Sequence, residues 1–185
     1  MTRPFAFLIR PHNPMRNFDP HRVAYYEKES WAAYYQRRWF RLLQLLIGLI
    51  RSTFGLSLWQ AIYISISSTR AQIAFAPKDN DVPKAIEQMK KFFVFVKNRH
   101  HEDFDPAEAA RAEVNWWVVH RKFFGHSDNP EVVEAVAQAY VAVYQIEPAK
   151  VHAAAYHRAQ AMVYSDVWVV SERDSNSPLL KQEED

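Results

Sequence analysis

The sequence predicts an all-α protein, a compact bundle of about six helices, and its glycine, proline and apolar content support this. The 185 residues include three glycines, set against ten prolines that mostly stand where a helix can begin. Tight β-hairpins depend on glycine for residues with positive φ, so its scarcity disfavours a β-rich fold. Hydrophobic residues make up 49% of the chain, enough for a substantial core in a single domain.

Helix starts are visible at several points along the chain. Asp19-Pro20, Asp105-Pro106 and Asn129-Pro130 each pair an N-cap acceptor with a proline suited to the first helical position. Ser57-Leu58-Trp59-Gln60 fits a capping box, in which two side chains bind each other's backbone N–H groups. These signals predict helices over residues 20–53, 58–75, 82–100, 106–124, 130–145 and 148–170.

The helix over 58–75 has an alternative. Ile62, Ile64 and Ile66 alternate with polar residues, which is the period of a strand. A single strand has no partner in this chain, so a helix is favoured there and a strand stays as the alternative.

Both ends of the chain differ from its middle. Residues 1–18 are rich in proline around the apolar run 5–9 and predict an extended arm. Residues 171–185 are polar and acidic and predict a disordered tail. The bundle domain is therefore expected to span residues 19–170.

The distribution of charge points to a binding surface. The net charge is +2, but residues 1–51 hold nine basic and three acidic residues, whereas the fifteen residues from Ser171 hold two basic and five acidic ones. A basic front end attracts acidic proteins or anionic lipid. It is also rich in aromatic residues. The candidate interface residues are Phe5, Phe7, Arg37, Arg38, Trp39 and Arg41.

These residues favour a protein partner, including a second copy of the chain, over an anionic membrane surface. Nucleic acid is disfavoured because no known nucleic-acid-binding motif accompanies the aromatic and basic residues. A membrane-spanning helix is disfavoured as well, because the uncharged run from Ser52 to Thr69 is too polar. Without cysteine or a recognisable secretory signal, the sequence predicts a cytoplasmic protein.

Several catalytic motifs are absent from the sequence. It has no cysteine, no glycine-rich phosphate loop, no Gly-x-Ser-x-Gly and neither Glu-x-x-His nor His-Glu-x-x-His. We therefore expect no metal site, and the sequence assigns no cofactor.

Polar residues nevertheless fall on the apolar faces of two predicted helices. At 100° per residue, Glu113 and His120 lie within an arc that also holds Trp116 and Trp117. In the last predicted helix, Arg158 falls in the centre of the apolar face, with Asp166 at its margin. An unpaired buried charge costs several kcal/mol, so these groups require partners.

Three interpretations compete for this set. The first is a structural ion-pair network, Glu113 with Arg158 and His120 with Asp166 or a backbone carbonyl, that fixes helix register. The second is a ligand or catalytic pocket in which Arg158 holds an anion. The third is a metal site, which the guanidinium of Arg158 disfavours by repelling a cation.

The sequence thus supports two functional hypotheses. The leading one is a non-catalytic binding or accessory protein that engages a partner or an anionic surface through its basic, aromatic first helix and arm. The alternative is an enzyme or a carrier of a cofactor or ligand, with a buried polar site between residues 106–124 and 148–170.

Overall fold

The computed structural model describes residues 14–171, 173–174 and 177–184. Within these ranges the chain forms a short 3-10 helix, Pro14–Arg16, and eight α-helices with no strand. The predicted all-α class is confirmed. The helices are α1 (Pro20–Tyr35), α2 (Trp39–Phe54), α3 (Leu58–Phe75), α4 (Val82–His100), α5 (Pro106–Lys122), α6 (Pro130–Tyr144), α7 (Pro148–Ser171) and α8 (Pro178–Glu184).

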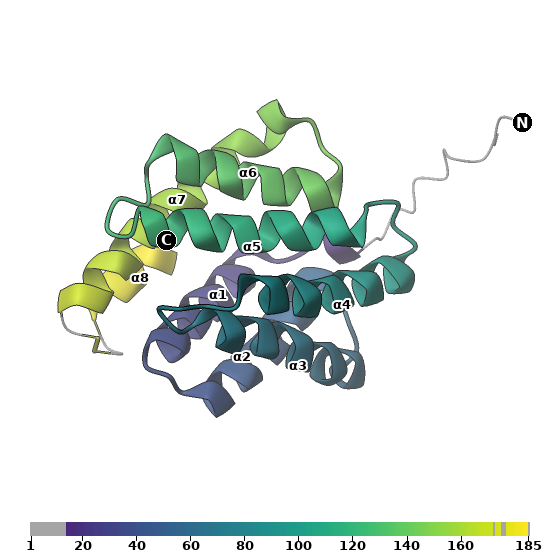
Figure 1. The fold of residues 1–185 in the computed structure, drawn as a ribbon, viewed down its shortest axis with the longest axis horizontal. Helices are drawn as coiled ribbons and strands as arrows, with labels where there is room; N and C mark the ends of the chain where they lie inside the picture. Colours follow the sequence, from purple (N-terminus) through teal and green to yellow (C-terminus); the bar gives the residue numbers. More distant parts are fainter. Residues whose placement is uncertain (1–13, 172, 175–176, 185) are drawn as a thin grey trace, which may run out of the picture.

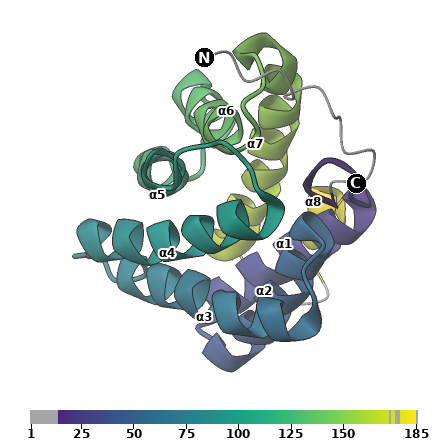
Figure 2. The same cartoon turned by 90° about the vertical axis from the view of Figure 1, so that its right-hand side faces the viewer.

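Consecutive helices pack as neighbours and form two groups (Figure 1). One group holds α2, α3 and α4, and the other holds α5, α6 and α7. Turned by 90°, the molecule shows α1 and α8 on one side of both groups (Figure 2). Helix α5 packs on both α4 and α6, and α1 packs on α2, α7 and α8, so these two helices join the groups.

The predicted helix starts are present. The Asp19 side chain accepts hydrogen bonds from the backbone N–H groups of residues 21 and 22. Asp105 and Asn129 cap α5 and α6 in the same way. Ser57 and Gln60 complete the capping box reciprocally, at 3.4 and 3.0 Å. Local sequence therefore sets these starts.

The stretch with alternating isoleucines is a helix, α3. Its buried residues recur every three or four positions, as one face of a helix requires, at Ala61, Ile64, Ser65, Ser68, Thr69, Ala71 and Phe75. Ile66 lies on the opposite, exposed face. The alternation therefore reflects two helix faces that both carry apolar residues.

The single helix predicted over 20–53 is two helices. Helix α1 ends at Tyr35, α2 begins at Trp39, and Arg37 between them has a φ of 56°. This left-handed residue turns the chain so that α2 folds back on α1. Neither proline nor glycine marks the break, so composition gave no sign of it.

The return of α2 brings Gly48 against the ring of Tyr26. A Cβ atom at position 48 would lie 2.2 Å from Cε1 of Tyr26, far inside van der Waals contact. The α1–α2 contact therefore requires glycine at this position.

Part of the acidic tail is helical. Residues 178–184 form α8, and Leu180, 3% exposed, packs with Trp168 and Val169 of α7. The indole N–H of Trp168 also donates to the backbone oxygen of Asp174 at 2.7 Å. Two leucines of the polar tail, Leu179 and Leu180, thus pack one short helix against the bundle.

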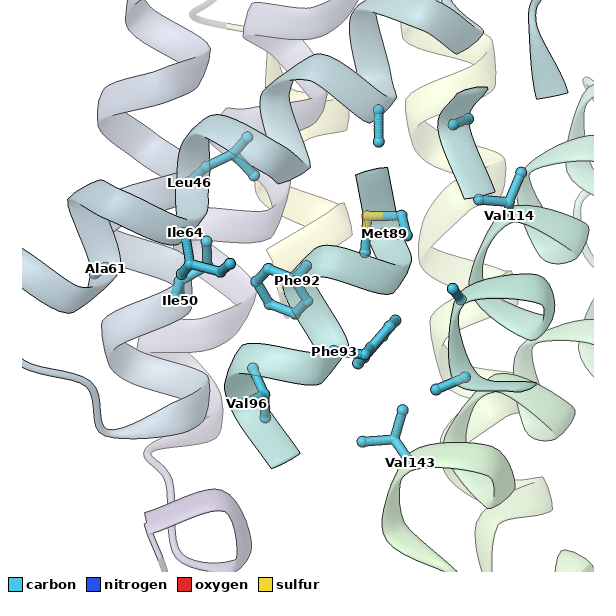
Figure 3. Close-up of a cluster of buried hydrophobic side chains, with 14 of the residues drawn as sticks. Leu46, Ile50, Ala61, Ile64, Met89, Phe92, Phe93, Val96, Val114 and Val143 are labelled. Carbon is cyan, nitrogen blue, oxygen red and sulfur yellow. The ribbon is translucent and has the colours of Figure 1, made fainter. Parts of the chain in front are cut away.

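The largest group of buried apolar side chains lies among α2, α3 and α4 and extends to α5 and α6 (Figure 3). Phe92 and Phe93 of α4 lie at its centre, edge to face at 5.2 Å between ring centroids. A second cluster joins α5, α6 and α7 around Val132, Val136 and Met162. The indole of Trp117 packs against both clusters, which places α5 between the two groups of helices.

Candidate functional site

A cavity of about 850 Å³ lies at the centre of the molecule. Helices α1 to α7 all contribute side chains to its wall, which is mostly apolar and aromatic. Trp31 of α1, Phe92 of α4 and Trp116 of α5 are among these residues. Four of the six predicted site residues, Glu113, Trp116, Trp117 and His120, line the cavity from α5, and a fifth, Arg158, lines it from α7.

The cavity opens beside the starts of α1 and α7. Of its lining residues, those that are exposed to solvent are Arg16, Phe18, Pro20, Ala154 and His157. The first three precede or begin α1, and the last two lie in the first half of α7. Their location marks an entrance between these two helices.

Arg158 contacts side chains from three other helices in the cavity wall. Its Nη2 donates to Oε1 of Glu27 on α1, and its Nη1 lies 3.4 Å from the hydroxyl of Tyr140 on α6. The guanidinium also lies over the ring of Trp116, 4.8 Å from the centroid. Its Nε is buried without a hydrogen-bond partner.

The charge state of Arg158 follows from this environment. Burial acts to lower the pKa of Arg158, but Glu27, Tyr140 and Glu113 outweigh it and the net direction is upward. The guanidinium is therefore a permanent cation, and Glu27 is its main counter-charge.

Glu113 occupies a different environment on α5. Its Oε1 accepts a hydrogen bond from the indole Nε1 of Trp117 at 3.2 Å. Burial raises the pKa of Glu113, against the opposing effects of Arg158 and of the Trp116 and Trp117 indoles. Trp116 lies close enough to affect this carboxyl, but its Nε1 makes no hydrogen bond of normal geometry.

The predicted direct pairing of Glu113 with Arg158 is wrong. Glu27 takes that place because α1 packs against α7 and brings its carboxylate to the guanidinium. Glu113 acts on Arg158 only through the electric field and keeps its own hydrogen bond one helical turn away. The expected network is therefore split between two carboxyl groups.

His120 and Asp166 form the other predicted pair. His120 Nε2 lies 3.1 Å from Oδ1 of Asp166, and both side chains are buried. Asp166 Oδ2 accepts hydrogen bonds from the backbone N–H of Gly125, at 2.9 Å, and from the hydroxyl of Ser127. An ionised carboxylate only accepts hydrogen bonds, so with Asp166 ionised the proton of this pair lies on Nε2.

This arrangement fixes both the imidazole and the loop between α5 and α6. Asp166 on α7 binds two groups of that loop, and the ring of His120 lies among the rings of Trp31, Trp116 and Phe124. Chemically, Asp166 can orient His120 as a proton acceptor or donor towards the cavity.

Three further residues, Glu27, Tyr140 and Arg121, belong to this region and are not among the residues predicted from the sequence. Glu27 stands in a basic segment and carries no local signal of a site. The sequence gives one signal for Tyr140, which lies one helical turn before a second tyrosine, Tyr144. In the structure, burial raises the pKa of Tyr144 to about 12. Arg121 donates to the backbone oxygens of Phe75 and Pro77, at 2.8 and 2.9 Å, and so holds the end of α3 against α5.

The candidate interface is only partly on the surface. Arg37, Arg38 and Arg41 are exposed, whereas Trp39 is half-buried and packs edge to face on Tyr34 at 6.0 Å. Phe5 and Phe7 lie outside the described residues. Most aromatic side chains of α1 also face the interior, which leaves the three arginines as the surface feature of this set.

Within the described part of the chain, no group of three or more His, Asp or Glu residues is arranged to hold a metal ion. No single helix among these residues is long and apolar enough to cross a membrane. Helices α2 and α3 together would be long and apolar enough, but the chain bends by 116° at the break between them.

Comparison of the chain with protein-family models, with curated proteins and with solved structures gave no match.

Proposed function

We propose that this protein binds a small amphipathic molecule in its central cavity. The observation that carries the proposal is the cavity of about 850 Å³, whose apolar wall holds a few polar groups close together. Ligand sites in proteins are typically about 300–1,000 Å³, mostly apolar, with a small number of polar groups that orient the ligand.

The polar groups indicate the chemistry of the ligand's head. Arg158 Nε is a buried N–H donor without an acceptor, the Trp116 Nε1 donor makes no hydrogen bond of normal geometry, and both residues line the cavity. A buried donor left without an acceptor costs about 1–3 kcal/mol, so a ligand that supplies an oxygen there gains that energy. The raised pKa of Glu113 favours its neutral form, which weakens the repulsion of an acidic head group.

The ligand is therefore an apolar molecule that carries an acceptor oxygen, such as a carboxylate, a carbonyl or a hydroxyl. Its body would lie against the aromatic wall formed by residues such as Trp31 and Phe92, and its head against Arg158. In this proposal the protein acts as a carrier or sensor of the molecule.

Proton transfer to a bound molecule is a second candidate function. It is supported by the orientation of His120 by Asp166 and by the location of His120 in the cavity wall. A positioned imidazole with an orienting carboxylate is a common general base. Recovery of each bound probe by extraction and mass spectrometry distinguishes the two functions, because a carrier returns the molecule unchanged.

A series of head groups on one apolar chain tests the proposal. Dodecanoic acid, dodecanol and dodecylamine are titrated below their micelle concentrations, and binding is followed by calorimetry. We expect the acid and the alcohol to bind with one site per chain and the amine to bind at least tenfold more weakly, since it supplies no acceptor in its charged form. Failure of all three to bind would contradict the proposal, and preferred binding of the amine would contradict the assigned head group.

Two tryptophan-to-phenylalanine substitutions, one in the cavity wall and one on the surface, provide the matched variants. Trp116→Phe removes the indole N–H and keeps an aromatic ring in the cavity wall, and we expect it to weaken dodecanoate binding about fivefold or more. Trp59→Phe is the control, because Trp59 is 78% exposed on α3 and does not line the cavity.

A further inference from the structure

Helix α3 carries a row of exposed apolar side chains that no described segment covers. Trp59 is 78% exposed, Tyr63 67%, Ile66 40% and Ile73 43%. Their spacing of three or four residues, completed by Arg70, places them in one line along the helix. We call Trp59, Tyr63, Ile66, Arg70 and Ile73 the α3 stripe.

The α3 stripe continues onto α4. The ring of Tyr63 lies 5.8 Å from the ring of Phe95, and Val94 beside it is 38% exposed. Lys91 and Arg99 are exposed on the same part of α4. The opposite side of α3 faces α2 and the core, so the stripe does not contribute to the interior.

Basic residues predominate around the stripe on α2 and α3, whereas on α4 Lys91 is paired with Glu87 at 2.7 Å. Residues 30–78 contain five arginines and one lysine and no acidic residue. Arg41 and Arg51 of α2 and Arg70 within the stripe are exposed. A surface of this kind attracts an anionic counterpart, and about 1 kcal/mol is typical for each basic residue near an anionic membrane.

We propose that the α3 stripe and its flanking arginines dock on the surface of an anionic lipid bilayer. Trp and Tyr are the side chains most enriched at membrane–water interfaces, where an apolar ring and a polar edge are both satisfied. Helices α2 and α3 carry arginines and no acidic residue, whereas a helix partner would call for charges of both signs along the stripe, as in coiled coils. The helix lies in the interface with only its exposed side chains inserted.

This proposal goes beyond the cavity and rests on different residues, because no member of the α3 stripe lines the cavity. A failure of either proposal therefore leaves the other intact.

Vesicle sedimentation tests the docking directly. The full chain is mixed with vesicles of phosphatidylcholine alone or with about a third of phosphatidylserine. We expect at least tenfold tighter binding to the anionic vesicles at low salt, and a decrease as salt screens the arginines. Equal binding to the two vesicles, or none to either, would overturn the proposal.

Three variants locate the surface. Trp59→Ser and Tyr63→Ser should each weaken binding to the anionic vesicles about tenfold, since each removes an inserted ring. Arg70→Gln should weaken it about fivefold. Tyr156→Ser is the control for loss of an aromatic side chain, because Tyr156 is 45% exposed on α7, away from the stripe, and it should not change binding.

The free protein is checked for misfolding and for self-association. All four side chains are exposed, so the variants should keep the thermal midpoint of the parent chain within a few degrees. Sedimentation equilibrium without lipid should give the same monomer mass for the parent chain and Trp59→Ser. A parent dimer that this substitution converts to a monomer would overturn the proposal and assign the stripe to self-association.

Discussion

Glu27 of α1 and Arg158 of α7 form an ion pair in the cavity wall, although 131 positions separate them in the chain. The pair lies in the cavity wall where α1 meets α7, and it leaves Nε of Arg158 without a partner. It therefore stabilises the contact between two helices while keeping one donor available to a ligand.

Glu27→Gln should lower the free energy of unfolding by about 1–3 kcal/mol, because it leaves the half-buried guanidinium without its main counter-charge. Urea denaturation measures the loss. The double variant with Arg158→Met should lose less than the sum of the single variants. Additive losses would show that the two residues do not interact. Glu131→Gln, in the exposed pair with Lys122, is the control and should cost less than about 1 kcal/mol.

Asp166→Asn should destabilise the protein by about 3 kcal/mol or more. The carboxylate accepts from His120, Gly125 and Ser127, and an amide can present only one acceptor oxygen to these three donors. Urea denaturation gives the loss, and hydrogen exchange at the Gly125 N–H should become faster. Asp128→Asn, exposed in the same loop, is the control. Equal stability of the two variants would contradict the anchoring role of Asp166.

The pH dependence of stability should report on Glu113. Its pKa is raised in the folded protein above the ordinary value of 4.5, so the unfolded chain releases this proton first as pH rises. The contribution of Glu113 to stability is thus complete below that pH and is lost as pH rises through the folded pKa. Glu113→Gln should therefore match the parent chain near pH 4 and be at least as stable at pH 8.

Free energies of unfolding between pH 4 and 8 measure this difference, with Glu134→Gln on the surface of α6 as the control. If Glu113→Gln costs about 3–5 kcal/mol at pH 8, Glu113 is instead an ionised partner in a buried pair, and our assignment is wrong.

Gly48→Ala should destabilise the protein even though alanine favours a helix by about 1 kcal/mol. The added methyl meets the ring of Tyr26, so α1 and α2 must separate or the ring must move, and we expect a net loss of about 1–3 kcal/mol. In a Tyr26→Ala background the same substitution should become neutral or stabilising. Thermal unfolding of the four chains gives the comparison, and equal effects in both backgrounds would refute the contact.

Features set by neighbouring residues could be predicted from the sequence, and features set by distant contacts could not. The capping box of Ser57 and Gln60 and the proline starts each depend on three or four consecutive residues, and the structure contains them. The break at Arg37 carries no such signal, because it arises from the packing of α2 back on α1.

The same distinction applies to the site. Helical periodicity placed Glu113 and His120 on the inner face of α5, since that requires only the helix itself. The choice of Glu27 over Glu113 as the partner of Arg158 depends on how α1 crosses α7. The cavity is a space that seven helices leave between them, and no local pattern encodes it.

A cavity-filling substitution tests the central claim, that a ligand binds in this space, most directly. Ala161 lines the cavity from α7 and is half-buried, whereas Ala153 lies exposed on the outer side of the same helix. We predict that Ala161→Trp keeps the fold, as judged by its thermal midpoint, and abolishes the calorimetric binding of dodecanoate, while Ala153→Trp binds it as the parent chain does. Undiminished binding by a folded Ala161→Trp variant would contradict the claim.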